Sequence, residues 1–369
     1  MTHPTALAIA LVGPLPPPSG GMANQVRQLA ELLRGEGIAV EVVQVNAPYS
    51  PSWIERVRGV RALFRLAPYL VRLWRAAGRN DLLHVMANSG WSWHLFAAPA
   101  ILLAKLRGKA VVVHYHGGEA EAFFEHSFTR VRPVLKQANA IMVPSGFLGQ
   151  VFAKRGFTAH VVPNIVNLER FAPGAGGNPA VPHILVARNL ERLYDNASAI
   201  RAFALIRAQH PGARLTIAGS GPERDTLECQ ARELGVAQAV TFTGRVENSE
   251  MPRLYQTANI VLNPSLVDNA PISMLEALAS GVPVVSTNVG GVPFLVQHEV
   301  TALLVPPGDH EAMARASLRL LAEPGLAQRL VRAGQELVSE FAWERVRGRL
   351  FSVYNGALGG QHLPLAEAR

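Results

Sequence analysis

Cysteine is nearly absent from this sequence of 369 residues, in which Cys229 is the only example. A single thiol excludes an intrachain disulfide and a metal centre built from several cysteines. The fold must therefore be held by buried apolar side chains. A cytoplasmic location is the simplest interpretation of such a composition.

Long apolar runs are missing as well. No run reaches the ~18 residues that a membrane-spanning helix needs. The apolar run at residues 6–14 lacks a basic stretch before it and a convincing cleavage site, so we interpret it as a strand and not a signal peptide. Hydrophobic residues still make up 49% of the chain and charged residues 17%. This excludes global disorder and, at ~150 residues per domain, predicts two domains with buried cores.

Aspartate is scarce, and lysine stops early. The five aspartates are Asp81, Asp195, Asp225, Asp268 and Asp309. No two of them are separated by a single residue, so the sequence has no Asp-x-Asp pair to hold a divalent cation. We therefore expect a protein that works without a metal ion or other cofactor. Lysine does not occur after Lys154, which leaves arginine as the cation for an anionic ligand in the second half.

Positive charge is concentrated in one stretch. The net charge is +8, and residues 53–79 hold seven arginines against one acid, Glu55. Because the excess is local, it does not indicate a general nucleic-acid-binding surface. From Arg58 onward the arginines recur at spacings of three, four and seven beside aromatic residues, a pattern typical of basic helices on anionic membranes. We expect Pro68 to split this stretch into two helices. The alternative is an ordinary domain helix whose arginines lie in water.

Short runs rich in Val, Ile and Leu alternate with helical patterns along the chain. In the first half we expect strands at residues 7–12, 39–45, 82–86, 110–114, 140–144 and 160–163. The pattern then restarts, with strands expected at residues 183–187, 215–218, 240–243, 260–263, 284–286 and 302–305. Near-continuous apolar strands separated by helices predict two α/β domains, each a doubly wound parallel sheet covered on both faces.

The same patterns predict the domain organisation. We expect an N-terminal domain at residues 1–172, a linker of loop-forming residues at 173–182 and a C-terminal domain at 183–342. The stretch 343–369 begins with an amphipathic helix, which we expect to return and brace the first domain. Such sheets bind ligands beyond the carboxyl ends of their strands, so we expect the active site in a cleft between the domains.

Two segments of the first half lie at expected strand ends. Gly20 and Gly21 follow the first strand and open a helix, so backbone amides there could approach an anion. A tight turn that needs glycine explains them equally well. His116 and Gly117 follow a later strand, where an imidazole could bind a sugar hydroxyl or a phosphate. Structural histidines at a strand end are the alternative.

Arg188 and Arg192 follow the first expected strand of the second domain. If the segment is helical, their spacing places both guanidinium groups on one face, where they could grip a diphosphate. If it is a loop, Arg192 points to solvent and the hydroxyl of Tyr194 takes the contact.

The richest segment is residues 263–291. A strand ends there, a loop follows, and a helix begins near Pro271. A carboxylate and the amides at the helix start would combine acceptors and donors, on Asp268, Asn269, Ala270, Pro271 and Ile272. Glu276 lies further along the same helix and is suited to accept two hydrogen bonds from vicinal sugar hydroxyls. The alternative makes Asp268 a helix cap and Glu276 a surface residue.

The chain resembles the retaining glycosyltransferase family 4, or glycosyl transferases group 1, over nearly its whole length. The landmarks, in family order, are Val162-Pro163-Asn164, Glu169-Arg170-Phe171, Gly219-Ser220-Gly221-Pro222, Val240-Thr241-Phe242-Thr243-Gly244, Glu276-Ala277 and Gly281-Val282-Pro283-Val284-Val285. The resemblance implies the GT-B architecture of two facing Rossmann-like domains. It also implies transfer of a hexose or related sugar, with retention, from a nucleotide diphosphate sugar carrying UDP or GDP. The acceptor would be a glycan or a lipid-linked hydroxyl in cell-surface polysaccharide or glycolipid assembly.

The resemblance also implies roles for the candidate residues. Asp268 would contact the donor sugar, Glu276 the ribose, and His116 would lie near the transferred sugar. Arg188 would grip the diphosphate, together with the amides at Gly20 and Gly21. Two positions depart from the family, because Asp268 stands for the usual glutamate and Arg192 is the nearest substitute for the usual lysine.

Two other functions remain open at this point. A sugar-nucleotide epimerase would share the architecture without transferring to an acceptor. A catalytically silent sugar-nucleotide-binding protein is favoured by the two departures from the family pattern. If the protein is a transferase, we expect acceptor recognition in the first domain, around residues 88–91 and 119–126.

Overall fold

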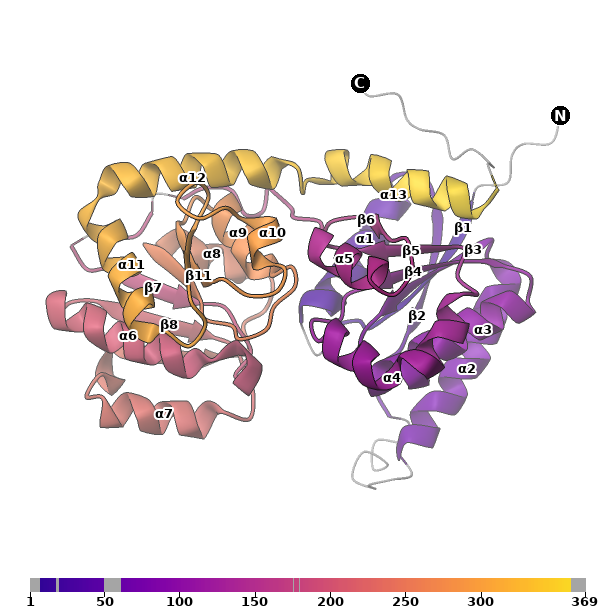
Figure 1. Cartoon of the computed structure of the whole chain (residues 1–369), viewed down its shortest axis with the longest axis horizontal. Coiled ribbons are helices and arrows are strands. Elements are labelled where there is room, and N and C mark those ends of the chain that lie inside the picture. Colours follow the sequence, from indigo (N-terminus) through magenta and orange to yellow (C-terminus); the bar gives the residue numbers. More distant parts are fainter. Residues whose placement is uncertain (1–6, 18–19, 50–60, 175, 179, 360–369) are drawn as a thin grey trace. The chain divides into compact units, whose positions relative to one another are not determined.

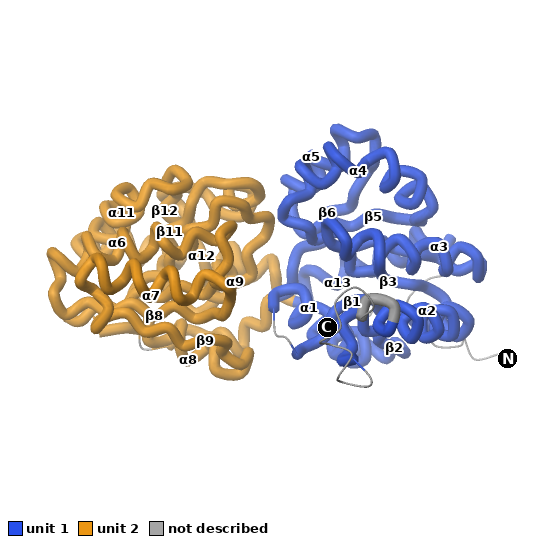
Figure 2. Tube along the Cα trace, turned by 90° about the horizontal axis from the view of Figure 1, so that it is seen from below, with its two compact units in different colours: residues 1–165, 343–369 blue, residues 166–342 orange. Residues whose placement is uncertain are grey.

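The computed structural model describes residues 7–17, 20–49, 61–174, 176–178 and 180–359, with the side chains of residues 61–63 left out. The chain divides into two compact units, which Figure 2 draws in different colours. Unit 1 comprises residues 1–165 and 343–369, and unit 2 comprises residues 166–342.

Unit 1 is built on a six-stranded parallel sheet with the order β2-β1-β3-β4-β5-β6 (Figure 1). The strands are β1 (Ala8–Gly13), β2 (Ala39–Gln44), β3 (Leu82–Ala87), β4 (Ala110–Tyr115), β5 (Ala140–Val143) and β6 (His160–Val161). The helices are α1 (Gly21–Gly35), α2 (Arg61–Arg79), α3 (Ala98–Leu106), α4 (Ala120–Leu135), α5 (Gly146–Ala153) and α13 (Trp343–Ala357). One apolar core lies between the sheet and α2 to α5, and a second lies between the sheet and α1 with α13.

Unit 2 repeats the plan with the order β12-β11-β10-β7-β8-β9. The strands are β7 (His183–Val186), β8 (Arg214–Ala218), β9 (Val240–Gly244), β10 (Ile260–Asn263), β11 (Val284–Thr287) and β12 (Leu303–Val305). The helices are α6 (Asn196–Gln209), α7 (Arg224–Glu233), α8 (Met251–Thr257), α9 (Ile272–Ala279), α10 (Val292–Leu295), α11 (His310–Ala322) and α12 (Pro324–Ser339). Helices α6, α7 and α11 pack on one face of the sheet, and α8, α9 and α10 pack on the other.

The expected α/β fold with two doubly wound parallel sheets is confirmed. Every predicted strand is present, and its ends differ from the prediction by at most two residues. The strands β3, β7, β10 and β11 are buried along their whole length, which explains why they read as continuous apolar runs.

The division between the units falls before residues 166–172, whereas the sequence placed the boundary after them. Val166 and Phe171 are buried in the core of unit 2, next to α8 and α9, and this packing assigns the segment to the second unit. Helix α13 belongs to unit 1 and buries Val346, Leu350 and Tyr354 against its sheet. Unit 1 is therefore assembled from two separate stretches of the chain.

Helix α2 is continuous through Pro68, so the prediction of two helices was wrong. Proline in the helix interior removes one backbone donor. Residues on both sides of Pro68 pack on the core of unit 1, Leu66 before it and Tyr69 and Leu73 after it. That shared burial keeps the residues on both sides of Pro68 in one continuous helix. Residues 53–60 of the basic stretch lie outside the described part of the chain.

Each sheet changes its winding direction at one place. In unit 1 the chain runs from β1 outward to β2 and then returns to place β3 on the other side of β1. In unit 2 it runs from β7 to β8 and β9, and then places β10 on the other side of β7. Ligands of doubly wound folds bind beyond the carboxyl ends of the strands at such a switch point. The ends of β7 and β10 therefore predict where unit 2 binds a ligand.

Candidate active site

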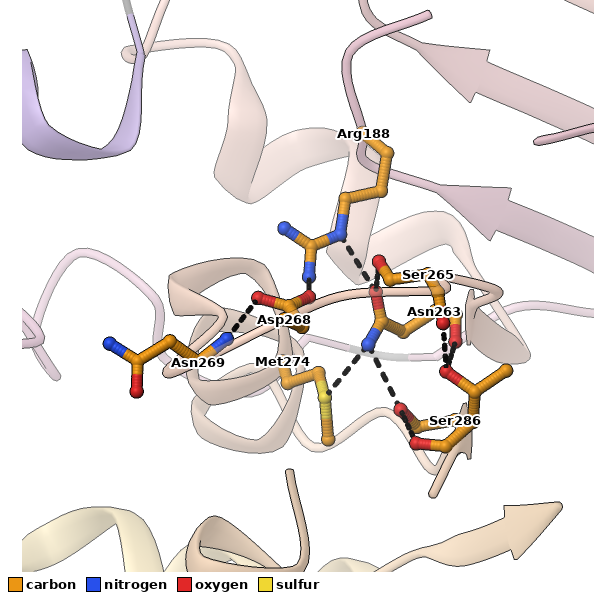
Figure 3. Close-up of polar contacts among 8 residues, drawn as sticks. Arg188, Asn263, Ser265, Asp268, Asn269, Met274 and Ser286 are labelled. Atoms are coloured by element: carbon orange, nitrogen blue, oxygen red, sulfur yellow. Dashed lines mark hydrogen bonds and ion pairs between the residues drawn. The ribbon is translucent and has the colours of Figure 1, made fainter. Parts of the chain in front are cut away.

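Polar side chains meet at the switch point of unit 2. Arg188 follows β7, and Asn263 ends β10, with Asp268 in the loop beyond it. The guanidinium group of Arg188 donates through Nε to Asn263 Oδ1 over 2.7 Å, and its Nη2 forms an ion pair with Asp268 Oδ2. Figure 3 shows the guanidinium group between the two acceptors. The side chains of Arg188 and Asp268 are 11% and 10% exposed, so the pair is largely shielded from water.

Asn263 is the centre of this network. Its Oδ1 also accepts from the hydroxyl of Ser265 over 3.0 Å, and its Nδ2 donates to Ser286 Oγ over 2.9 Å (Figure 3). Thr287 at the end of β11 adds a hydrogen bond to the backbone carbonyl of Ser265. These contacts fix the amide that orients Arg188. The sequence reasoning missed this supporting role, although Asn, Ser and Thr at the ends of buried strands were a visible signal.

A turn that contains two glycines packs directly against the loop that carries Asp268. A Cβ on Gly290 would lie 2.1 Å from the carbonyl oxygen of Asp268, and one on Gly291 would lie 1.8 Å from that of Asn269. No side chain fits at such distances. The amide of Gly291 donates to the Asp268 carbonyl over 3.0 Å. The turn therefore clamps the backbone that carries the Asp268 carboxylate.

The loop after β7 is held in the same way. A Cβ on Gly219 would lie 1.9 Å from the carbonyl oxygen of Arg188, and one on Gly221 would lie 2.3 Å from that of Leu190. Leu190 donates its amide to the Ser220 carbonyl over 3.1 Å. Backbone packed directly on backbone explains the physical need for both glycines.

Pro271, a predicted site residue, is the N-cap of helix α9, and the helix itself begins at the next residue, Ile272. No side chain caps the helix, so Asp268 is not its cap. The Asp268 carboxylate instead pairs with Arg188 and accepts the amide of Asn269 over 3.0 Å. The Asn269 amide was expected to face a ligand and is engaged inside the loop. Ala270 and Ile272 flank Pro271 and are partly exposed.

Glu276 lies one turn into α9 and is partly buried. The hydroxyl of Tyr255 donates to its Oε2 over 3.0 Å. Burial raises the pKa of Glu276 to about 7, while Tyr255, Arg170 and Arg188 oppose that rise. The structure thus places both acids of the predicted pair in the surroundings of Arg188. Arg170 is a cation near this site that the sequence reasoning did not assign.

The segment from Arg188 to Arg192 is not an α-helix, so the two arginines do not share a helix face. Residues 188–191 form a loop, and a short 3₁₀ turn follows at Arg192–Tyr194. Arg192 is exposed, whereas the ring of Tyr194 lies 5.0 Å from the Arg188 guanidinium carbon. The structure selects the loop alternative, in which Tyr194 accompanies Arg188.

In unit 1, His116 follows β4 and is partly buried. Its ring lies 4.2 Å from that of His114, whose ring lies 5.4 Å from that of His84. Burial lowers the pKa of His116 to about 4 and that of His84 to about 3. Burial and the neighbouring histidines also hold the pKa of His114 well below its usual value. At neutral pH these imidazoles are uncharged, so His116 is suited to a hydroxyl partner.

Gly117 and the start of α1 complete the predicted residues of unit 1. A Cβ on Gly117 would lie 2.2 Å from Ser89 Oγ and 2.8 Å from the Tyr115 hydroxyl, so packing requires glycine. Gly20 is the N-cap of α1, and Gly21 is its first residue. Within the described residues, no atom outside the adjoining chain lies within 4 Å of a Cβ built on Gly20, and no side chain caps the helix. The first amides of α1 are therefore left without a side-chain cap.

Among the described residues, no group of three or more His, Cys, Asp or Glu side chains is arranged to hold a metal ion. The helices that the structure describes include none with the length and apolar character to cross a bilayer.

Comparison with known proteins identifies relatives of both units. A family described as "Glycosyl transferases group 1" matches residues 175–337, and one described as "Glycosyltransferase Family 4" matches residues 19–170. Glycogen synthase of Mycobacterium tuberculosis is 30% identical over 94% of this chain and 93% of its own length. D-inositol 3-phosphate glycosyltransferase of Salinispora tropica is 33% identical over 95% of this chain and 83% of its own.

Solved structures support the fold. Sucrose-phosphate synthase from Thermosynechococcus elongatus matches with a TM-score of 0.77 at 23% identity, covering 96% of this chain and 100% of that one. The Anabaena protein HepE, solved in complex with UDP, matches with a TM-score of 0.72 at 18% identity, covering 95% and 100%. Because relatives of 30% and 33% identity match more than nine-tenths of this chain, the chain belongs to the group 1 glycosyltransferases of family 4 and is a nucleotide-sugar-dependent glycosyltransferase.

Proposed function

We propose that unit 2 binds a nucleotide diphosphate sugar at the ends of β7 and β10 and that its sugar is transferred with retention of configuration. The observation that carries this is the meeting of Arg188 with Asp268 at the switch point of the sheet. A fixed guanidinium group is suited to the diphosphate, whose negative charge grows as the glycosidic bond breaks. Asp268 then faces the sugar that the diphosphate carries.

The remaining residues have distinct proposed roles. Glu276 accepts hydrogen bonds from the ribose, and the uncapped start of α9 and the first amides of α1 add donors for phosphate oxygens. His116 contacts a hydroxyl of the transferred sugar as a neutral imidazole, because burial keeps its pKa at about 4. The transfer with these residue roles does not require a protein nucleophile. The leaving group is stabilised by arginine and amides, which supports turnover without a metal ion.

A panel of nucleotide sugars tests this function. We expect the purified protein, incubated with UDP- and GDP-sugars and an acceptor extract, to release nucleotide diphosphate and form a glycosylated product detected by mass spectrometry. The rate should be unchanged in EDTA. An isomerised donor without an acceptor product would indicate an epimerase, and no reaction with any donor would indicate a binding protein. Loss of activity in EDTA that magnesium or manganese restores would contradict metal independence.

The acceptor is proposed to be a glycan or a lipid-linked hydroxyl on unit 1. One relative, 26% identical over 92% of this chain and 96% of its own length, is a phosphatidylinositol monomannoside mannosyltransferase of Mycobacterium tuberculosis, and another is glycogen synthase. Trp91 follows β3 and is 78% exposed, with its ring 6.3 Å from that of His94. An exposed indole offers an apolar face for a sugar ring. These names and this surface support a role in polysaccharide or glycolipid assembly.

Helix α2 is proposed to contact an anionic membrane surface from the cytoplasmic side. Phe64, Val71 and Trp74 are 43–50% exposed on this helix, and Arg72 and Arg75 are exposed beside them. On α3, Leu102 and Leu106 are also exposed, and Arg107 lies over the Trp74 ring. Apolar side chains among arginines suit a headgroup layer, at about 1 kcal/mol per charge.

Vesicle cosedimentation tests the membrane contact. We expect the protein to sediment with vesicles of anionic phospholipid and to stay in the supernatant with zwitterionic vesicles. Replacing Arg72 and Arg75 with glutamate should weaken binding strongly, because it lowers the net positive charge of residues 53–79 by four while the buried face is untouched. Arg315→Glu and Arg332→Glu on unit 2 make a charge-matched control, expected to bind as the wild type. Equal and negligible binding to both vesicle types would contradict the proposal.

A further inference from the structure

Tyr255 is a phenol in the core of unit 2 whose hydroxyl meets a carboxylate. It lies within α8, which ends at Thr257, and is 0% exposed, with its ring edge-to-face against Phe171 at 5.9 Å. The hydroxyl donates to Glu276 Oε2 over 3.0 Å. No other hydrogen bond to this carboxylate is seen within the described chain, so Oε1 is left for another partner.

A buried tyrosine needs a partner for its hydroxyl, but that partner need not be an acid. Tyr69 in unit 1 is equally buried and donates to the backbone carbonyl of Phe96 over 2.7 Å. Backbone carbonyl groups of this kind are available in any protein core, so a buried tyrosine hydroxyl does not require a carboxylate partner. Hydrogen bonds to ionised groups are stronger than neutral ones, so the contact of Tyr255 favours the carboxylate form of Glu276. Burial also raises the pKa of Tyr255, so the phenol stays a donor.

Three groups facing Glu276 favour its negative charge against burial. Tyr255 comes from α8, Arg170 from the segment before β7, and Arg188 from the loop after β7. Burial is the largest effect and raises the pKa of Glu276 to about 7. The carboxylate is thus near its midpoint at neutral pH, where one hydrogen bond has a large influence on its ionisation.

We propose that Tyr255 is a positioning residue for the nucleotide: it holds Glu276 as a carboxylate with Oε2 engaged and Oε1 presented to the ribose hydroxyls. This inference rests on the proposed role of Glu276 in donor binding. Tyr255 touches neither the ribose nor the reacting atoms. Its effect on the donor passes through the charge and orientation of Glu276.

The pH dependence of nucleotide binding tests the proposal. UDP and GDP, each alone, are titrated by calorimetry into wild type and Tyr255→Phe between about pH 5 and about pH 9. In the wild type, affinity rises with pH as Glu276 loses its proton. Without the phenol donor the pKa of Glu276 rises further, so the midpoint of the curve moves up by about one pH unit. Affinity at neutral pH then falls about five- to ten-fold and recovers at high pH.

Three further variants make the result decisive. Tyr69→Phe removes a buried tyrosine hydroxyl from the other unit and should keep the wild-type midpoint. The phosphate groups of the nucleotide titrate in the same way with every variant, so they do not alter the comparison of midpoints. Glu276→Gln should bind weakly without this midpoint, and Tyr255→Phe should add nothing in that background. Wild-type affinity in Glu276→Gln would refute the ribose role itself. A weakened Glu276→Gln beside an unshifted midpoint in Tyr255→Phe would overturn the inference and leave the role of Glu276 intact.

Discussion

Replacing Arg188 with alanine is expected to lower kcat/KM for the donor by about 10³-fold. The guanidinium group is oriented by Asn263 beyond the end of β7, and no lysine follows Lys154 in the chain. A preorganised cation acts most strongly on the charge that develops in the transition state, so kcat should fall more than KM rises. Steady-state kinetics with a donor from the nucleotide-sugar panel measure the effect.

Folding must be separated from chemistry in this variant. Arg188→Ala leaves the Asp268 carboxylate without its cation, and breaking a shielded pair in this way costs about 3–5 kcal/mol. The double variant Arg188→Ala, Asp268→Asn removes both charges and should melt closer to the wild type while staying inactive. Arg188→Lys keeps the charge without the fork and should recover part of the rate. An Arg188→Ala enzyme with native melting and a wild-type rate would refute the assignment.

Arg192→Ala tests whether Arg192 replaces the lysine that is usual in the family. The side chain is exposed, so it reaches the diphosphate only by moving onto it. We expect kcat to fall by about 10²-fold if it does so. A wild-type rate would assign the second contact to Tyr194, whose ring lies 5.0 Å from the Arg188 guanidinium carbon.

Replacing Asp268 with asparagine is expected to change binding and turnover in opposite directions. In the wild type the Asp268 carboxylate forms an ion pair with the Arg188 guanidinium group, which the diphosphate must also bind. Asparagine keeps the shape and removes the competing charge, so the affinity for UDP or GDP alone should rise about ten-fold. Transfer should fall about 10²-fold, because the contact to the sugar loses its charge. Calorimetry measures the first effect, and product formation under saturating donor measures the second.

Asp268→Glu is the matched control, because it keeps the charge and restores the residue usual in the family. Its nucleotide affinity should stay near that of the wild type. If Asp268→Asn instead weakens nucleotide binding, the carboxylate helps to hold Arg188 in place and does not compete for it.

The fold could be predicted well from the sequence. Runs of Val, Ile and Leu mark β3, β7 and β10 because these strands are buried on both faces. Helix α2 was predicted less well. The helix-breaking preference of Pro68 was offset by packing of α2 on the core, which one sequence does not display.

The site residues could be predicted where side chains of suitable chemistry lie beyond the ends of neighbouring strands. Arg188 lies just after β7 and Asp268 lies in the loop after β10, and these strands are neighbours in the sheet, so their meeting could be inferred from topology. The support of Arg188 by Asn263 depends on the side-chain geometry of three neighbouring strands, β7, β10 and β11. The contact of Tyr255 with Glu276 joins two helices, and no motif spans them. Sequence spacing carries little information on such contacts.

The order of synthesis follows from the split composition of unit 1. Unit 2 is a continuous stretch, so all of its residues are synthesised before α13. Residues 1–165 meanwhile lack the helix that covers Leu11, Val112 and Met142. Domains generally fold as units during translation. The second half of the enzyme should therefore mature first, and a nascent chain truncated before residue 343 should keep an exposed apolar face for chaperones to bind.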